Sequence, residues 1–369
     1  ATDLVGVPTK MVRAISPVIE AKFGIPRRSV MIACSHTHCG PALDHKLSYM
    51  LDMKESDWQQ VREYQQWLND KIVEVVGAAV ADLKPARLST GSGRTTFAAN
   101  RRSPKGVGPY DQQVPVLRVE SEDGLQLRGL VFGYACHNTT MSFYNWFGDY
   151  SGLAQLYLED RHPGAIAMFF TGGGADQNPL PRRRLELAEK YGRMLATAVD
   201  QVVDRPMQTV SGSLRTAFAE VDLAFNKLPS RETLEADLKN SSRYTRARAK
   251  LLLEEWDRDG SLPKTYPYPI QVWQIGRGLT WVALGGELVV DYQIRLKREL
   301  GQNRTWVTGY ANDVMAYIPS ERVLAEGGYE GDTSMIVYQR PSKWKAGLEE
   351  KIVSTVHRLA RQTSATDSK

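Results

Sequence analysis

The chain is poor in several features that would narrow its class at once. Only three of its 369 residues are cysteine, so they cannot all pair, and no spacing matches a thiolate zinc site. No apolar stretch reaches the roughly 18–20 residues that a bilayer-spanning helix needs. The Gly-x-Gly-x-x-Gly fingerprint of dinucleotide-binding folds and the Gly-Lys-Ser/Thr of a P-loop are both missing. The sequence therefore predicts neither a disulfide framework nor a membrane-spanning helix nor these nucleotide sites.

The composition is ordinary for a globular protein. Hydrophobic residues make up 42% of the chain, charged residues 24%, and the net charge is +5. The densest basic cluster is Arg182–Arg184, and a second lies between Arg243 and Lys250. Both are either solvated surfaces or contacts to an anionic surface such as lipid headgroups. No RNA-binding aromatic pattern accompanies them, so we predict no nucleic-acid partner. The chain starts at Ala1 without an initiating Met, and we expect a segment upstream of it.

Strand-like and helical runs alternate along the whole chain, without a repeat, a low-complexity linker or a clear boundary. We therefore predict one mixed α/β domain over residues 1–369, with loops at strand ends forming the site. The expected strands are Val30–Cys34, Leu88–Phe97, Val114–Glu120, Leu127–Cys136, Ala165–Phe170, 209–225, a hairpin at Ile270–Leu284, and 305–310. The expected helices are Met11–Phe23, Asp57–Leu83 after the capping residue Ser56, Leu185–Val203, Arg231–Asp259, 289–300 and 343–361.

Three of the six histidines lie where apolar runs give way to loops. His36 and His38 follow the Val30–Cys34 run, and His137 follows the Leu127–Cys136 run. Residues i and i+2 of a strand point to one side, so His36 and His38 can face one cavity. Imidazole is a common metal ligand and general base, which favours a metal site. Three ordinary hydrogen-bonded histidines at strand ends are the alternative.

Other loops could also carry chemistry. The glycines at 172–174 form either an anion-binding nest or a tight turn. Asp176 beyond them is a candidate general base, a carboxylate behind the site or a helix cap for the segment that follows it. Glu287 ends a hairpin strand before a helix, where a carboxylate is favoured with or without a metal. Tyrosines at 310, 317 and 329 lie in glycine-rich loops. From these residues alone the sequence predicts a metallohydrolase.

At these positions the chain resembles the neutral or alkaline (non-lysosomal) ceramidase family of zinc amidases, in its catalytic domain. The resemblance rests on six blocks in matching order: Ser35–Pro41, Asn100–Arg101, His137–Met141 with Gly148–Gly152, Gly286–Glu287, Asn312–Tyr317 and Tyr329–Gly331. Cys39 stands where the family usually has Ser.

The resemblance implies a zinc site and its surroundings. The zinc ligands would be His36, His137, Glu287 and Tyr317. His38, Arg101 and Tyr329 would line the site around the scissile amide. Two imidazoles and a carboxylate suit catalytic zinc, which polarises a carbonyl and lowers the pKa of water.

The chain also departs from the family pattern. Asp176 stands at the position of a Ser that the family requires, and as a carboxylate it would act as a base or orient water. From this resemblance we expect that the sequence does not include the family's C-terminal β-domain and that the N-terminal segment is absent or truncated.

These observations leave three hypotheses about function. The first is a zinc-dependent hydrolase of ceramide or a related N-acyl lipid, with peripheral membrane contact. The second is a relative that cleaves a smaller or more polar amide or ester. The third is a metal-binding module without turnover, which the retained ligand positions disfavour.

Overall fold

Two β-sheets packed face to face form the centre of the molecule. The computed structural model describes residues 1–51, 53–103 and 108–364. The first sheet has the order β5-β4-β3-β1-β7 and consists of Ile166–Thr171, Leu127–Tyr134, Gln113–Ser121, Ala86–Arg94 and Gln208–Val210. The second has the order β12-β10-β9-β8 and consists of Thr305–Thr308, Leu279–Leu284, Thr265–Ile275 and Leu214–Ala224. All neighbours are antiparallel except β4–β5 and β10–β12.

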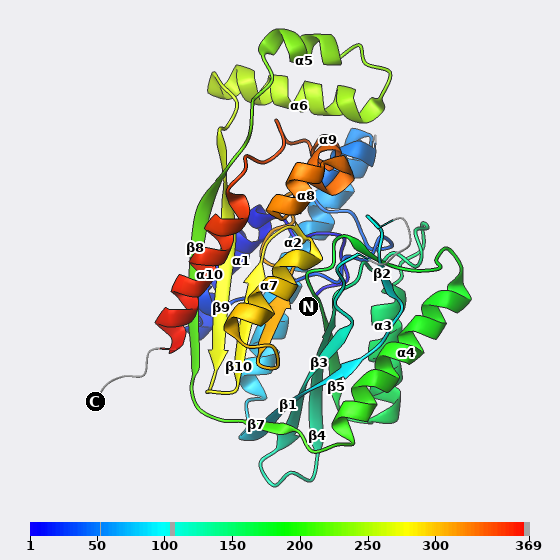
Figure 1. The fold of residues 1–369 in the computed structure, drawn as a ribbon, viewed down its shortest axis with the longest axis vertical. Helices are drawn as coiled ribbons and strands as arrows, with labels where there is room; N and C mark the ends of the chain where they lie inside the picture. Colours follow the sequence, from blue (N-terminus) through cyan, green and yellow to red (C-terminus); the bar gives the residue numbers. More distant parts are fainter. Residues whose placement is uncertain (52, 104–107, 365–369) are drawn as a thin grey trace.

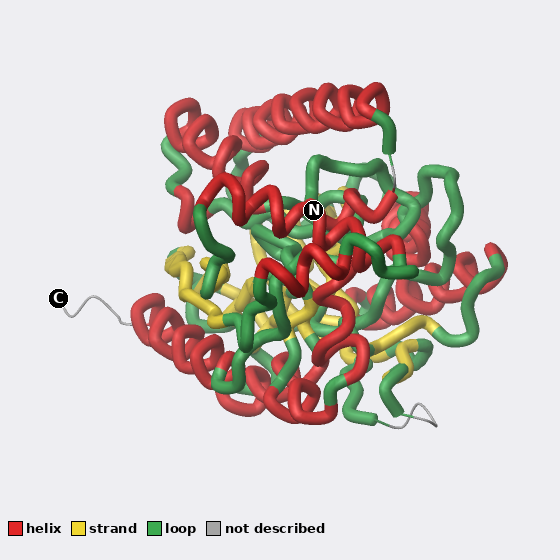
Figure 2. The backbone as a smooth tube through the Cα atoms, turned by 90° about the horizontal axis from the view of Figure 1, so that it is seen from above, coloured by secondary structure: helices red, strands yellow, loops and turns green. Residues whose placement is uncertain are grey.

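Helices cover the outer faces of both sheets. Helices α3 (Asp149–Arg161) and α4 (Leu185–Val203) pack against the first sheet, and α10 (Leu348–Ser364) packs against β8 and β9 (Figure 1). Helix α1 (Thr9–Phe23) joins the same core as α10 and contacts α2 (Glu55–Ala81). Figure 2 shows the strands in the middle of the molecule with helices around them. The result is a layered mixed α/β fold, as the sequence predicts.

Strand periodicity explains why two of the apolar runs are nearly continuous. In β4, Leu130 and Phe132 face the helices, whereas Val131 joins Leu279 and Trp306 between the sheets. Successive side chains of a strand point to opposite faces, so a strand buried on both sides needs apolar residues at every position. In β10, Val282 likewise belongs to the core shared with α10. These two strands end beside the loops that carry the candidate site.

Two short strand pairs and several short helices complete the structure. Strands β2 (Ala98–Asn100) and β6 (Gln177–Pro179) are antiparallel, and β11 (Glu287–Leu288) and β13 (Tyr317–Ile318) are parallel. Helix α7 (Val290–Leu300) follows β11 directly. A π-helical turn, Tyr329–Thr333, lies between α8 (Glu321–Glu326) and α9 (Ser334–Val337). None of the helices in the described ranges is long and apolar enough to cross a bilayer.

Several expected elements differ in the structure. Val30–Cys34 is a buried extended segment with only isolated bridges, at Ala33 to Ala311 and Cys34 to Thr2, so the prediction of a strand is wrong. Among the residues that the structure describes, no strand pairs with it to form a ladder.

Two helix predictions also need correction. The expected helix Arg231–Asp259 is two helices, α5 (Arg231–Asp237) and α6 (Arg243–Asp259), because Ser242 accepts a hydrogen bond from Thr245 N and starts a new one. Helix α2 begins at Glu55, where Asp57 rather than Ser56 accepts a bond from the flanking backbone, the N–H of Lys54. Both differences concern capping chemistry.

Candidate metal centre

Two histidines and a glutamate from three distant segments meet in the interior. The Nε2 atoms of His36 and His137 lie 3.3 and 3.1 Å from Oε2 of Glu287. All three side chains are almost fully buried. A buried carboxylate shared by two imidazoles is costly unless the groups are paired or bind an ion.

The backbone at His36 is held in an unusual conformation. His36 has a φ of 62°, in the left-handed region that residues with a Cβ rarely adopt. The preceding segment is fixed by bonds from Cys34 N to Tyr310 O and from Ser35 N to Thr2 O. Because the backbone turns here, His36 and His38 come together through a bend, not through strand alternation. Strained backbone of this kind gathers at functional sites.

His137 and Glu287 are placed by the ends of strands. His137 follows β4, and its N–H donates to Gln177 O at 2.9 Å. Glu287 lies on β11, and its register partner on β13 is Tyr317. Gly286 before it has a φ of 73°, and a Cβ there would lie 2.7 Å from Ala316 O, so glycine is required for this approach.

Tyr317 completes a set of four groups that the resemblance implies as ligands. Its hydroxyl lies 3.3 Å from Nε2 of His137. The structure therefore brings His36, His137, Glu287 and Tyr317 together from positions spread over the chain. Their roles stay predictions, but their proximity fits one centre.

The outer hydrogen bonds orient these groups inward. Nδ1 of His36 donates to Val5 O at 2.5 Å, and Nδ1 of His137 donates to Gly174 O at 3.4 Å. With Nδ1 protonated, each Nε2 presents a lone pair to the centre. Tyr338 donates to Oε1 of Glu287, and Tyr310 to Oε2 at 3.4 Å. This donor set fits a divalent metal such as zinc.

His38 lies at the outer edge of the cluster. It is exposed, and its Nε2 is 3.3 Å from Nε2 of His36. The nitrogens of His36, His38 and His137 all lie within 4.8 Å of one another, close enough to share a metal ion. His38 thus has access both to the cluster and to solvent.

Arg101 and Tyr329 lie beside Tyr317. Arg101 donates from Nη2 to the Tyr317 hydroxyl at 3.0 Å and from Nε to Glu330 at 2.6 Å. Arg102 holds the other oxygen of Glu330 at 2.6 Å. The ring of Tyr329, which is 44% exposed, packs on Tyr317 with centroids 5.3 Å apart. The two predicted substrate-contacting groups therefore share one side of the cluster.

Asp176 is not part of this cluster. Its carboxylate is fully buried and accepts bonds from Val290 N, the first residue of α7, at 2.8 Å and from Nδ2 of Asn100 at 2.9 Å. The segment after Asp176 is strand β6, so the prediction of a cap for that segment is wrong; the carboxylate instead accepts a bond at the start of α7, which is distant in the sequence. A catalytic role for Asp176 stays a prediction.

Burial shapes the protonation states at the centre. Burial lowers the pKa of His137 to about 4 despite Glu287, so its imidazole is neutral. Burial would raise the pKa of Glu287, but His36 and His137 lower it well below its usual value. Burial also raises the pKa of Tyr317 well above its usual value and that of Tyr329 to about 12. Tyr329 is therefore a hydrogen-bond donor at neutral pH.

Sequence reasoning missed three supporting groups. Tyr338 lies outside every motif, Val5 contributes only its carbonyl, and Glu330 lies within the block Tyr329–Gly331, which predicts no role for it. The burial of Tyr338 and its bond to Glu287 are visible only in the fold.

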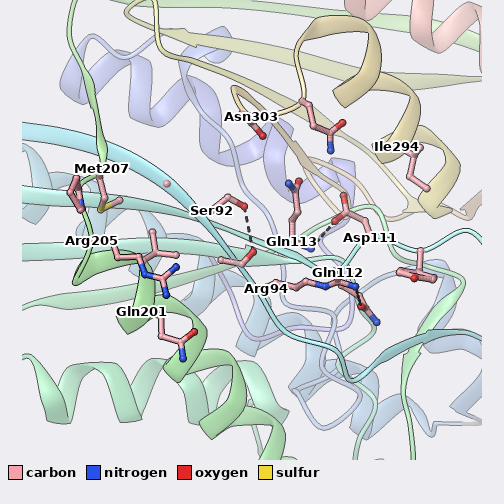
Figure 3. Close-up of a pocket in the computed structure, with 16 residues that line it drawn as sticks. Ser92, Arg94, Asp111, Gln112, Gln113, Gln201, Arg205, Met207, Ile294 and Asn303 are labelled. Carbon is pink, nitrogen blue, oxygen red and sulfur yellow. Dashed lines mark hydrogen bonds between the residues drawn. The ribbon is translucent and has the colours of Figure 1, made fainter.

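A polar cavity of about 920 Å³ lies away from the cluster (Figure 3). Its lining includes Ser92 and Arg94 of β1, Asp111, and Gln201 of α4. None of the clustered side chains lines it. Cavity size alone therefore does not locate the chemistry of this molecule.

Comparison with known proteins agrees with the resemblance. No model of a known protein family matches the chain. It is 23% identical over 419 residues to neutral ceramidase of Pseudomonas aeruginosa, and this match covers 91% of the chain but 61% of that protein. The crystal structure of neutral ceramidase from Pseudomonas aeruginosa matches the whole chain with a TM-score of 0.69 and 20% identity, over 67% of its own length. A structure of ceramidase complexed with C2 matches with a TM-score of 0.69, 19% identity and coverage of 100% and 68%. The chain is thus similar to neutral ceramidase in sequence and has its fold.

Proposed function

We propose that this chain is a zinc-dependent amidohydrolase that removes the acyl chain from ceramide or a related N-acyl lipid. The observation that carries the proposal is the convergence of His36, His137 and Glu287 beside Arg101 and Tyr329. The similarity to neutral ceramidase supports an amide as the bond that is cleaved. We further infer that residues 1–369 act as one catalytic domain, since the cluster draws on residues from 36 to 338.

In this proposal His36, His137, Glu287 and Tyr317 hold the metal. Zinc bound there would supply a Lewis acid for the amide carbonyl and lower the pKa of water. Glu287 brings the negative charge, and its two phenol partners keep its orientation fixed. Because both imidazoles have their Nδ1 atoms engaged, neither ring can rotate freely.

Arg101, Tyr329 and His38 act on the substrate. Arg101 is positively charged and Tyr329 is protonated, so both can donate to an oxygen that gains negative charge during amide cleavage. Burial would lower the pKa of Arg101, but Tyr317 and Glu330 raise it above its usual value, which keeps the charge in place. His38, at the solvent side, is placed to pass a proton between substrate and water.

Asp176 supports a second candidate function. The family's Ser position is occupied here by a carboxylate whose oxygens are bonded to Val290 N and Asn100. These bonds favour a positioning role for Asp176, and the replacement of Ser by a carboxylate favours a changed substrate, a smaller or more polar amide or ester.

The test combines metal analysis with a substrate panel. We expect about one zinc per chain and release of fatty acid from ceramide. Cleavage of short polar amides or esters but not ceramide would select the second hypothesis. Bound zinc without turnover of any substrate in the panel would select a binding module.

A further inference from the structure

The loop after His137 places large aromatic side chains in solvent. Residues 142–147 read Ser-Phe-Tyr-Asn-Trp-Phe and connect the His137 segment to α3. Trp146 is 83% exposed and Tyr144 is fully exposed. We call residues 142–147 the aromatic loop. Two exposed aromatic side chains so close together place apolar area in water, which is a feature of surfaces that bind another molecule or a membrane.

The aromatic loop is fixed at its base. Met141 N donates to the Asp149 carboxylate at 2.8 Å, which closes the loop. Phe147 N donates to Cys39 O at 3.0 Å, and Thr37 Oγ1 donates to Phe147 O at 2.6 Å. Thr37 and Cys39 flank His38, so the loop stands directly beside the exposed edge of the metal centre.

The rings within the loop divide into two sets. Phe143 and Phe147 pack edge to face, with centroids 5.8 Å apart. They are partly buried, whereas Tyr144 and Trp146 are exposed. The packing of Phe143 on Phe147 stabilises the conformation of the loop. Tyr144 and Trp146 point into solvent and can contact a surface outside the protein.

A basic segment runs along the other side of this loop. Arg183 N donates to Thr140 O at 2.7 Å, and Arg182 Nη1 donates to Thr139 Oγ1 at 3.2 Å. Arg183 and Arg184 are exposed, and Glu186 near Arg184 is the acidic neighbour at 3.7 Å. Aromatic and positively charged groups therefore share one surface next to His38.

We propose that the aromatic loop and Arg182–Arg184 form a docking surface for an anionic lipid bilayer. Trp and Tyr favour the level of the lipid headgroups, where their rings meet apolar chains and their polar atoms meet water. Arginines beside them meet the negative surface potential of anionic lipids. The role of this surface rests on the proposed function, because docking here would bring the exposed side of the candidate metal centre, at His38, to the level of the bilayer where the amide of a lipid lies. The position of the aromatic and basic residues does not depend on that function.

Vesicle binding tests the surface without any turnover. The full chain is mixed with vesicles of phosphatidylcholine alone or of equimolar phosphatidylcholine and phosphatidylserine, and the bound fraction is measured by sedimentation. We expect binding to the mixed vesicles that weakens as salt is added. The pair Tyr144→Ser with Trp146→Ser should lower the partition coefficient roughly tenfold, as the loss of buried aromatic area predicts.

The arginines are tested separately. Arg183→Ala and Arg184→Ala should each weaken binding to the mixed vesicles roughly fivefold and leave binding to phosphatidylcholine unchanged. Arg361→Ala is the matched control, since Arg361 is exposed on α10, a helix that packs against β8 and β9 of the second sheet. This variant should bind as the unaltered chain does.

Further arms separate this inference from the proposed function. His36→Ala should lose turnover and keep vesicle binding. Hydrolysis of ceramide by a chain that binds no vesicle would overturn the docking surface and leave the function standing. Unchanged binding in the loop and arginine variants would also overturn it. So would a dimer in sedimentation that Trp146→Ser converts to a monomer, because a second copy would then occupy the surface.

Discussion

The candidate metal centre and the glycine loop at 172–178 both include residues just after strands, His137 after β4 and Gly172 after β5, yet their polar groups have opposite arrangements. In the loop, Gly173 N donates to Gln293, Ala175 N donates to Leu288 O, and the Asp176 oxygens accept from neighbouring residues. A Cβ at Gly174 would lie 2.3 Å from the Ala135 backbone, so close packing explains that glycine. The polar groups of this loop therefore have hydrogen-bond partners in neighbouring segments, and the loop is a structural turn.

In the metal centre the inner atoms are left facing one another. The Nδ1 atoms of His36 and His137 are bonded to backbone carbonyls, but both Nε2 atoms converge on Glu287. Lone pairs directed at a shared point suit a bound cation, whereas polar groups that already have hydrogen-bond partners indicate a structural role. The hydrogen-bond partners of each polar atom therefore distinguish functional residues from structural residues better than the residue type does.

The largest expected effect comes from removing a group of the metal centre. His36→Ala, His137→Ala or Glu287→Ala should abolish most zinc binding, because a small ligand set tolerates no loss. Tyr338→Phe should weaken zinc affinity by roughly 10- to 100-fold, as loss of an orienting bond does. Metal content per chain, measured after dialysis against a chelator series, gives both results. Full zinc content in all three alanine variants would show that these residues do not bind the metal. The proposed difference between this cluster and the glycine loop would then be wrong.

The next effect concerns the donors beside Tyr317. Arg101→Ala and Tyr329→Phe should each lower turnover by about 100-fold, since a donor to a developing oxyanion contributes on the order of 3 kcal/mol. The Michaelis constant, zinc content and thermal unfolding should change little. Raised Michaelis constants with normal turnover would instead assign both residues to ground-state binding. Tyr110→Phe, at a tyrosine of similar exposure that lines the cavity away from the cluster, is the matched control for Tyr329→Phe.

Part of the fold could be predicted because several strands are apolar runs of strand length. The runs of β4 and β10 are apolar on both faces, a local signal that burial between two layers explains. Val30–Cys34 has the same signal but lacks a partner strand, and partners are set by tertiary structure. The break in Arg231–Asp259 depends on one Ser242 bond, which periodicity does not contain.

The site was predictable to the extent that motifs mark strand ends. The proximity of His36 and His38 was expected from strand alternation and is found, but a left-handed backbone at His36 produces it. Glu287 and Tyr317 come together because two short strands, β11 and β13, pair in parallel. No pattern in the sequence predicts this pairing. Tyr338 carries no local signal, because its role exists only after residues 51 positions apart are brought together.

The smallest expected effect concerns Asp176. It tests most directly whether the glycine loop differs from the candidate metal centre in having only a structural role. Burial raises its pKa from 3.8 to about 6, so the folded chain holds a proton there more tightly than the unfolded chain does. Protonated Asp176 therefore stabilises the fold below about pH 4, and this contribution is lost as the pH rises through about 6. Asp176→Asn cannot titrate. The unfolding free energy of the unaltered chain, relative to this variant, should fall between pH 4 and 7 by at most about 3 kcal/mol, at about 1.4 kcal/mol per pKa unit.

Chemical denaturation across that pH range, with turnover measured on the same samples, decides the role of Asp176. A positioning residue changes stability and its pH profile and leaves zinc content intact. A general base would instead lose turnover by about 100- to 10,000-fold with unfolding unchanged, and Asp176 would then join the metal centre despite its bonds to Val290 and Asn100. Asp176→Ser adds a second reading, since it introduces the residue of the resembled family. Faster ceramide cleavage by that variant would show that this loop determines the choice of substrate. Activity that falls only because the variant is less stable would show that the loop is structural.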